Sequence, residues 1–274
     1  MTERRTILVV NDDGISAPGI KHLVQAVSNF GDVFVVAPEF EQSGVGLCIT
    51  TRQSLQIKQV SLFNGIPSWS VSGTPADCVK IALSVLLDKV PDVIVSGINP
   101  GCNGGRNFLY SGTVGGVIEG VLRGIPGIAF SLFDMINPRF ELFTPYIPSI
   151  VEYVLKHPLP KGTMMNVNFP CMNLKYRRDN SQEIRGFKLA TQGKLYIVEE
   201  PEEVEEMSYL LGFRLQEFDE HEESDIHLLQ NGYIACSPVH VDELTDKEFY
   251  RANKHGFETF MKQSDHLFSE ECTI

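Results

Sequence analysis

The regular alternation of short apolar runs with segments of helical spacing constrains the fold of this chain more than any other feature. A run such as Ile7 to Val10 has no polar side chain to present to water, which is typical of a strand buried on both faces. The strand candidates are Thr6 to Val10, Val33 to Ala37, Trp69 to Ser72, Val93 to Ser96, Ile128 to Leu132 and Met164 to Phe169. The helical segments between them are Ile20 to Phe30, Pro75 to Leu87, Thr113 to Arg123 and Pro145 to Lys156. Repeated strand–helix–strand units predict an α/β fold with a doubly wound, mostly parallel sheet.

The pattern changes after Cys171, and we divide the chain near that point. Residues 1–174 are the predicted core, and residues 175–245 are predicted to form an extended, β-rich arm or small subdomain. Residues 246–274 are predicted to carry a C-terminal helix. The elements expected beyond the core are two strands within Gly186 to Val198, a strand at Gly232 to Pro238 and a helix at Asp246 to Ser269.

The negative charge of the chain is concentrated in one segment of the arm. Residues 199–225 carry twelve acidic residues and one basic residue, Arg214, and so hold −11 of the formal net charge of −12. The rest of the chain is nearly neutral and has no basic face for duplex DNA or RNA. A single mononucleotide still fits a local pocket of such a protein.

Membrane and disulfide-stapled classes are not favoured. Apolar runs such as Ile81 to Leu87 are far shorter than the ~20 residues of a membrane span. The apolar stretch behind Arg4 and Arg5 stops at Asn11, before the core of a signal peptide is complete. The six cysteines show no Cys-x-x-Cys spacing, so we expect free thiols in a reducing compartment. We therefore expect a cytoplasmic protein without a membrane partner.

Polar residues follow the first two predicted strands, where α/β sheets bind their ligands. Asp12 and Asp13 converge on one ligand only if the first strand has already turned into a loop, which Gly14 permits. The local alternative is a simple Asp-Gly turn. Two carboxylates this close nevertheless repel each other unless a cation lies between them. Ser43, after the second strand, adds a hydroxyl.

The fourth predicted strand is followed by a loop rich in Asn and Gly, which holds Asn99 and Asn103. Such a loop keeps side-chain and backbone amides available where a ligand approaches closely. Ser111, Gly112 and Thr113 then precede a helix, whose N-terminus offers N–H groups and a favourable dipole to a phosphate. Taken alone, these three residues are equally well explained as a helix cap.

Two carboxylates, a hydroxyl and carboxamides are hard oxygen donors, which suit Mg²⁺ or Mn²⁺ far better than zinc. A divalent cation beside a phosphate-binding helix end indicates phosphoryl chemistry. The alternative is a non-catalytic, Mg²⁺-dependent regulator that responds to phosphate or binds a nucleotide. A receiver domain of that kind also needs an Asp after its third strand and a Lys after its fifth, where this chain has Ser72-Gly73 and Ser131-Leu132.

A second enzymatic alternative is thiol chemistry at Cys171, because Cys171 and Arg177 have the Cys-x₅-Arg spacing of cysteine phosphatases. Residues 172–176 contain no glycine to wrap a phosphate, which argues against this alternative. Chance alone produces such a pair in a chain with this many cysteines and arginines.

Eight segments of the chain together resemble the SurE (survival protein E) family of nucleotidases, in the same order and over nearly the whole length. The segments are NDDG at 11–14, APG at 17–19, AP…QSG at 37–44, GTPADC at 73–78, SGINPGCN at 96–103, YSGTVGG at 110–116 with Glu119-Gly120, NVNFP at 166–170 and NGYIACSP at 231–238. Several ordered motifs are specific, whereas NDDG alone is not.

The resemblance implies a Rossmann-like, three-layer α/β/α core and a metal-dependent 5′-nucleotidase, a phosphatase of nucleoside 5′- and 3′-monophosphates. By motif match, Asp12, Asp13, Ser43 and Asn99 hold one divalent cation per subunit, Mg²⁺ or Mn²⁺. Asn103, Ser111, Gly112 and Thr113 hold the phosphate, so Asp12, Asp13 and Asn103 are the candidate catalytic residues. The C-terminal arm is implied to assemble a homo-oligomer, a dimer or a tetramer.

The chain departs from the usual family pattern at Arg106 and at Ala235-Cys236-Ser237, which concerns substrate preference and local packing. We expect a water molecule to attack phosphorus without a covalent phospho-enzyme. A carboxylate of the Asp12–Asp13 pair takes the proton from that water, and the sequence leaves open which one. The apolar residues within the acidic segment are expected to pack against another subunit: Tyr209, Leu210, Leu211, Phe213, Leu215 and Phe218.

Overall fold

The computed structural model describes residues 4–216 and 218–262, and for Phe213 and Leu215 it describes the backbone only. Two compact units divide the chain, Met1–Val241 and Asp242–Ile274. The first unit contains the whole central sheet, including two strands that follow residue 174 in the sequence. The arm segment is therefore joined to the core by backbone hydrogen bonds.

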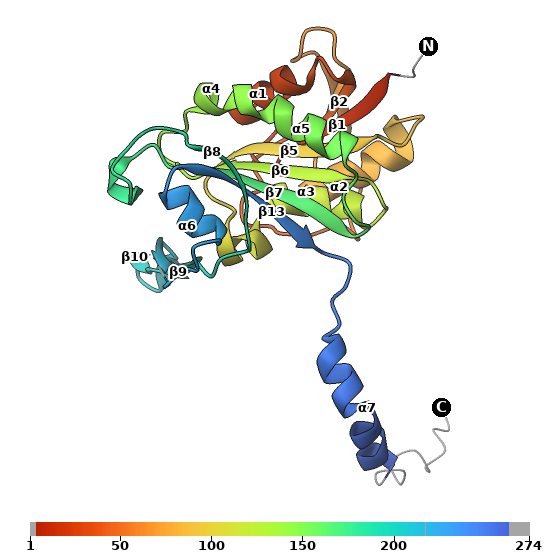
Figure 1. Ribbon diagram of the computed structural model, residues 1–274. Helices are drawn as coiled ribbons and strands as arrows, with labels where there is room; N and C mark the ends of the chain where they lie inside the picture. The colour runs from red at the N-terminus through yellow and green to blue at the C-terminus, as the bar shows by residue number, and fades with distance from the viewer. Residues whose placement is uncertain (1–3, 217, 263–274) are drawn as a thin grey trace. The chain divides into compact units, whose positions relative to one another are not determined.

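The first unit is built on a nine-stranded sheet with the order β3-β4-β2-β1-β5-β6-β7-β13-β8 (Figure 1). The six strands from β4 to β7 in this order are parallel, while β3 and β13 run antiparallel to the neighbours that connect them to these six. The strands of this sheet are β1 (Arg5–Val10), β2 (Gly31–Pro38), β3 (Ile57–Val60), β4 (Ser68–Val71), β5 (Val93–Pro100), β6 (Gly127–Leu132), β7 (Thr163–Phe169), β8 (Gly186–Leu189) and β13 (Tyr233–His240). The predicted doubly wound, mostly parallel α/β fold is confirmed.

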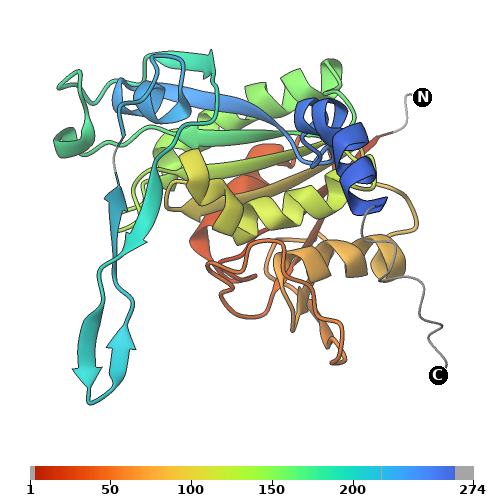
Figure 2. The same cartoon turned by 90° about the horizontal axis from the view of Figure 1, so that it is seen from below.

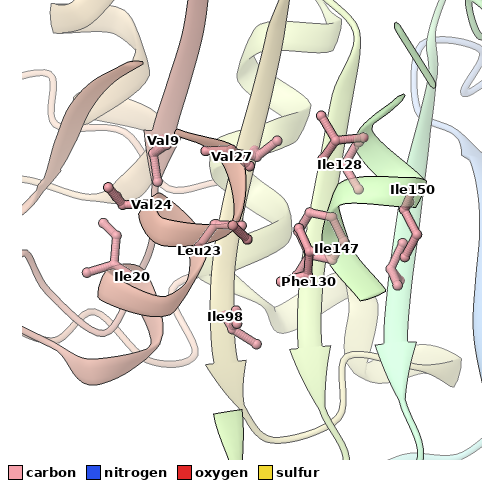
Figure 3. Packing of buried hydrophobic residues seen from close by; sticks show 14 of the residues in the cluster. Val9, Ile20, Leu23, Val24, Val27, Ile98, Ile128, Phe130, Ile147 and Ile150 are labelled. Atoms are coloured by element: carbon pink, nitrogen blue, oxygen red, sulfur yellow. The ribbon is translucent and has the colours of Figure 1, made fainter. Parts of the chain in front are cut away.

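Helices cover both faces of the sheet, which explains why its strands are apolar on both sides. In β1, Ile7 and Val9 belong to the apolar cluster under α1 (Pro18–Val27) and α5 (Ile147–Lys156) (Figure 3). Leu8 and Val10 pack in the cluster on the opposite face. That face is covered by α2 (Pro75–Ile81) and α3 (Gly112–Val121), as the two views show (Figure 2). The short helix α4 (Phe140–Phe143) precedes α5 and adds two buried phenylalanines to the first cluster.

The chain reverses its direction of travel across the sheet between β1 and β5. From β1 it builds outward to β2 and β4, and then it returns to β5 and continues through β6 to β7. The loops after β1 and β5 consequently leave in opposite directions, and open α/β sheets bind their ligands at such a position, beyond the carboxyl ends of the strands. Asp12 and Asn99 lie at this position of the fold.

The arm differs in detail from the expectation. The two strands expected within Gly186 to Val198 do not pair with each other, because β8 joins β13 in the main sheet and β9 (Tyr196–Glu199) pairs with β12 (Phe213–Gln216). The acidic segment contains the hairpin of β10 (Glu202–Glu205) and β11 (Ser208–Leu210), which projects from the body of the unit (Figure 2). It also reaches the first residue of a short helix, α6 (Asp225–Gln230), which the sequence analysis missed.

The second unit contains α7 (Lys247–Lys262), so the expected C-terminal helix is present in the part that is described. The remainder of the expected helix, to Ser269, lies outside the described residues. All side chains of α7 are exposed, including Phe249, Phe257 and Phe260. No helix in the described part of the chain is both long and apolar enough to cross a membrane.

Candidate active site

The first strand ends in a turn that brings its two aspartates to one place. The Asn11 side chain donates a hydrogen bond to the carbonyl of Gly14 (2.9 Å), and Gly14 has a φ of 100° that favours glycine. Asp12 is buried, and its backbone carbonyl accepts a hydrogen bond from the Gln42 amide (2.7 Å). The predicted turn is therefore present, and it places the two carboxylates close enough to interact at the carboxyl end of β1, instead of on opposite faces of a strand.

Asp12 is tied directly to the beginning of α3. Its Oδ1 accepts a hydrogen bond from the Thr113 hydroxyl (2.5 Å). The backbone N–H of Thr113 also donates to the Asp12 carboxylate. A Cβ added to Gly112 would lie 2.8 Å from the Asp12 Cβ and 3.0 Å from the Gln42 carbonyl oxygen. Only a glycine lets the helix start approach the carboxylate this closely. The structure thus brings Asp12, Gly112 and Thr113 together, as the motifs predict.

Asp13 is left without compensation. Its Oδ2 is buried and has no hydrogen-bond partner among the residues described. Burial, followed by the charges of Asp12 and Glu41, raises the pKa of Asp13 to about 8. Burial also raises the pKa of Asp12 to about 6, against the lowering effect of the Thr113 hydrogen bonds. Two carboxylates that resist ionisation in this way are stabilised by a cation placed between them.

Ser43 lies in the loop after β2, which is fastened to the site at several points. Its hydroxyl is exposed and donates to Glu41 Oε1 (2.6 Å), so Glu41 is a third acidic side chain close to the pair. The Gly46 amide donates to the carbonyl of Tyr110 (2.9 Å), next to Ser111. Asp77, from the GTPADC motif, accepts hydrogen bonds from the Thr50 amide and hydroxyl and holds the far end of the loop.

Asn99 lies at the carboxyl end of β5 and Asn103 in the loop after it, and the structure gives them different surroundings. Asn99 is half-buried, and its amide donates to the carbonyl of Gly101 (2.8 Å). Asn103 is buried, and its side-chain amide donates to the Ser131 hydroxyl (2.8 Å). Asn168 and Asn166, from the NVNFP motif, bind the backbone N–H and carbonyl of Asn103. Asn103 is thus anchored from below by polar residues of β6 and β7.

Ser111 caps α3, with its hydroxyl accepting a hydrogen bond from the Val114 amide (3.2 Å). The hydroxyls of Ser111 and Thr113 are therefore both engaged within the chain, on Val114 and on Asp12. The helix N-terminus, with its dipole, is the feature of this segment that favours an anion.

The donor set around Asp12 and Asp13 fits a hard divalent cation. It contains two adjacent carboxylates, of which one has a buried oxygen without a partner, and neutral oxygen donors on the neighbouring loops. Within the described residues, His, Cys, Asp and Glu form no group of three that could hold a metal. A site of the mixed carboxylate, hydroxyl and amide type suits Mg²⁺ or Mn²⁺ and does not suit zinc.

The surroundings of Cys171 do not support a nucleophilic thiol. Its Sγ donates to Asp134 Oδ1 (3.1 Å), and burial together with this hydrogen bond raises the pKa of the thiol to about 12. The Arg177 guanidinium is buried and bound to both carboxylate oxygens of Asp179, at 2.9 and 2.8 Å, and to two carbonyls. Four of the five N–H donors of Arg177 are engaged in this way, which leaves no pair of donors for a phosphate.

One departure from the family pattern contacts the arm, and the other lies within it. The Arg106 guanidinium lies over the rings of Tyr196 and Phe218, 5.6 and 5.5 Å from their centroids. Ala235, Cys236 and Ser237 lie in β13 and are buried. These residues pair in antiparallel register with Asn168, Val167 and Asn166 of β7, next to the polar residues under Asn103.

Comparison with known proteins supports one family. The family model described as Survival protein SurE matches residues 7–199. The chain is 48% identical over 267 residues to the 5′-nucleotidase SurE of Protochlamydia amoebophila, which covers 95% of this chain and 100% of that protein. It is 40% identical over 242 residues to the 5′-nucleotidase SurE of Flavobacterium psychrophilum, covering 86% of this chain and 91% of the relative.

A solved structure agrees with the sequence comparisons. The crystal structure of the SurE protein from Aquifex aeolicus superposes with a TM-score of 0.77 at 36% sequence identity and covers 91% of this chain and 98% of its own. The resemblance carried by the ordered motifs is thereby confirmed. The chain belongs to the SurE family.

Proposed function

We propose that this protein is a metal-dependent 5′-nucleotidase that hydrolyses nucleoside 5′- and 3′-monophosphates to nucleoside and phosphate. The observation that carries the proposal is the half-buried Asp13 carboxylate, whose buried Oδ2 has no partner among the described residues and which lies beside Asp12 at the N-terminal end of α3. The names of the relatives, 5′-nucleotidase SurE, support the same activity. No contact of the described site residues favours the non-catalytic regulator over this enzyme.

We assign one divalent cation per subunit, Mg²⁺ or Mn²⁺, to Asp12, Asp13, Ser43 and Asn99. When bound, such a cation neutralises the charge of the phosphate and polarises it for attack. Asp12 is oriented for this role by Thr113, whose hydroxyl donates to Oδ1. Asp13 contributes the oxygen that the protein itself leaves unpaired.

The phosphate is assigned to Asn103 and to the Ser111-Gly112-Thr113 turn. The N–H groups at the start of α3 and the helix dipole favour an anion at this position. The glycine at position 112 removes the side chain that would otherwise separate such an anion from Asp12. A carboxylate of the Asp12–Asp13 pair then accepts the proton of the attacking water, and no side chain bonds covalently to phosphorus.

The test is a phosphate-release screen over nucleoside 5′- and 3′-monophosphates with each divalent metal. We expect release from one or more nucleotides with Mg²⁺ or Mn²⁺, loss of activity in excess EDTA, and recovery when the metal is added back. The screen also reports the preferred base and position. Activity that resists the chelator, or no release from any nucleotide with any metal, would contradict the proposal.

We further infer that the protein is a homo-oligomer assembled through the hairpin of β10 and β11. Tyr209, Leu210 and Leu211 are exposed there, with 52 to 65% of their surface accessible, which is unusual for adjacent large apolar side chains. Phe218, by contrast, packs within the chain against Tyr196 (5.6 Å between ring centroids). Substitution of Leu210 and Leu211 by serine is expected to reduce the mass measured by light scattering. An unchanged mass would rule out this interface.

A further inference from the structure

Asp225, at the start of α6, is a completely buried carboxylate that reaches the loop after β5 from 120 positions later in the sequence. Its Oδ2 accepts a hydrogen bond from the Gly105 amide (2.9 Å). Its Oδ1 accepts hydrogen bonds from the amides of Gly193 (2.9 Å) and Ile226 (2.8 Å). A buried carboxylate is tolerated when backbone donors compensate it in this way. One side chain thus joins three segments of the chain.

Further hydrogen bonds next to Asp225 join residues 105–107 of this loop to residues 192–197 of the arm. The Gln192 side chain donates to the Gly105 carbonyl, and the Arg106 amide donates to the Leu195 carbonyl (2.7 Å). The Ile197 amide donates to the Asn107 side chain (2.9 Å). Residues 105–107 and 192–197 are therefore held together by hydrogen bonds from both sides.

Two glycines make this approach possible. Gly105 has a φ of 56°, and a Cβ at this position would lie 2.4 Å from the Leu195 carbonyl oxygen. A Cβ at Gly193 would lie 2.7 Å from Asp225 Oδ1. A side chain at Gly105 would displace the backbone of Leu195, and one at Gly193 would displace the Asp225 carboxylate. The arm and the loop are shaped to meet at Asp225.

The segment held in this way connects the two halves of the candidate phosphate site. Gly105 is two residues from Asn103, and a 3₁₀-helix, Gly105–Tyr110, leads from it to Ser111 and α3. Asn103 is fixed from the sheet side by Ser131, Asn166 and Asn168, and this attachment does not involve the arm. A displacement of Gly105 would therefore change the spacing between Asn103 and Ser111.

We propose that Asp225 is a positioning residue of the phosphate site, which sets the distance between Asn103 and the Ser111-Gly112-Thr113 turn by clamping Gly105 against the arm. The proposal rests on the proposed function, because it assigns the phosphate to these residues. Asp225 itself touches no substrate atom. The arm is thereby a structural part of the active site.

The variant that tests this role is Asp225→Asn, which keeps the volume of the side chain. The asparagine side chain has only one acceptor oxygen. Its NH₂ group cannot accept a hydrogen bond from a backbone N–H, so the variant loses its bond either to Gly105 or to Gly193. We expect the affinity for inorganic phosphate, measured by calorimetry in saturating Mn²⁺, to fall about tenfold, and KM for a nucleoside monophosphate to rise in parallel. The affinity for Mn²⁺ alone, measured by its effect on thermal unfolding, should stay within about twofold, since Asp12 and Asp13 do not contact the clamp.

The matched control is Asp92→Asn, an aspartate that accepts a hydrogen bond from the Thr6 amide (2.7 Å) at the opposite end of the strands. Its phosphate affinity and KM should equal those of the wild type. A milder variant, Gln192→Ala, removes one hydrogen bond to Gly105 from an exposed residue and folds even where Asp225→Asn fails to. We expect it to weaken phosphate binding about threefold.

The outcomes separate the two proposals. Unchanged phosphate affinity in both folded variants, or an equal loss of Mn²⁺ affinity, would overturn the positioning role. A wild-type protein that binds phosphate but hydrolyses no nucleotide would contradict the proposed nucleotidase alone, and phosphate calorimetry on the variants would still test Asp225.

Discussion

Asp12–Asp13 and Cys171–Arg177 are the two places where this sequence offers groups suited to phosphate chemistry, and both follow the carboxyl end of a buried parallel strand. Asp13 keeps a buried oxygen without a described partner, and its carboxyl has a raised pKa of about 8. Around Cys171 the polar groups compensate each other: the thiol donates to Asp134, and Arg177 donates four of its five N–H groups to Asp179 and two carbonyls. The two places therefore differ in whether their charged groups are compensated within the protein.

The two places differ in how they affect the free energy of unfolding of the ligand-free protein. Hydrogen bonds that occupy most of the donors of a buried guanidinium stabilise the fold, so a ligand gains little by binding there. Two neighbouring carboxylates with raised pKa values lower the stability of the folded protein at neutral pH, and a cation that binds between them would raise it again. Four variants or conditions test this contrast.

The largest effect is expected from Asp13→Asn, which removes a carboxylate from the candidate cation site and keeps its shape. We expect the rate of nucleotide hydrolysis to fall by at least ~10³-fold, or about 4 kcal/mol of barrier, with an unchanged circular dichroism spectrum. Phosphate release at saturating Mn²⁺ measures the change. Residual activity above about 3% of the wild type would show that the cation site is elsewhere.

Arg177→Ala is expected to affect stability instead of catalysis. It removes a buried guanidinium that binds Asp179 and the carbonyls of Cys171 and Glu183, so we expect a loss of about 3 kcal/mol in the free energy of unfolding. The melting temperature should fall by about 6 to 9 °C, while kcat per folded molecule stays unchanged. Arg177→Lys keeps the charge without the fork of donors and should lose an intermediate amount. A loss of kcat in the folded variant would show that Arg177 takes part in the reaction.

The carboxylate pair predicts how the stability of the metal-free protein depends on pH. The folded-state pKa values of Asp12 and Asp13 are raised to about 6 and about 8, so the stability they contribute is complete at acidic pH and is lost as the pH rises through these values. Asp13→Asn removes one of the two titrations. We therefore expect the metal-free variant to melt about 3 °C or more above the wild type near pH 8.5, and the difference to shrink near pH 5.

Differential scanning fluorimetry in EDTA measures these melting temperatures, and addition of Mn²⁺ supplies the control. At the higher pH, Mn²⁺ should raise the melting temperature of the wild type and have little effect on Asp13→Asn. Equal melting temperatures of the two proteins at both pH values would mean that the pair is not strained in the folded state.

The smallest effect is expected from Cys171→Ser. A thiol whose pKa is raised to about 12 is protonated at neutral pH and is a poor nucleophile. We expect the hydrolysis rate to stay within about threefold of the wild type, under ~1 kcal/mol of barrier. Activity that resists a chelator and disappears in this variant would mean that Cys171, and not the Asp12–Asp13 pair, carries the reaction.

The core of the fold was predictable because its signals are local. Ile7 and Val9 face one helical layer and Leu8 and Val10 the other, and an uninterrupted apolar run is the direct consequence of that arrangement. The arm was less predictable. Its strand β9 pairs with β12, and β8 with β13, because pairing partners are chosen by register and packing over long distances. Spacing within the segment carries no such information.

Some residues of the candidate site were likewise predictable from the sequence, and others were not. The residue types of Asp12, Asp13, Ser43, Asn99 and the Ser111–Thr113 turn pointed to it, since each follows a strand or begins a helix. Glu41, Asp77 and Asp225 were missed as parts of its surroundings. Asp77 had a local signal, as the acid of a helix start, but its contact with Thr50 is not visible in the sequence.

The sequence by itself determined the layers of this protein, the strand ends at which its polar residues collect and, through its ordered motifs, its family. Hydrophobic periodicity and turn residues act over a few positions, so they can be read from the chain directly. Only the tertiary structure decided which polar groups are compensated. It placed Thr113 on Asp12, Asp179 on Arg177 and Asp225 on Gly105, and it left Asp13 with an unpaired oxygen. Except for Arg177 and Asp179, these contacts join residues about a hundred positions apart, and they exist only because the strands and the arm pack in one particular arrangement.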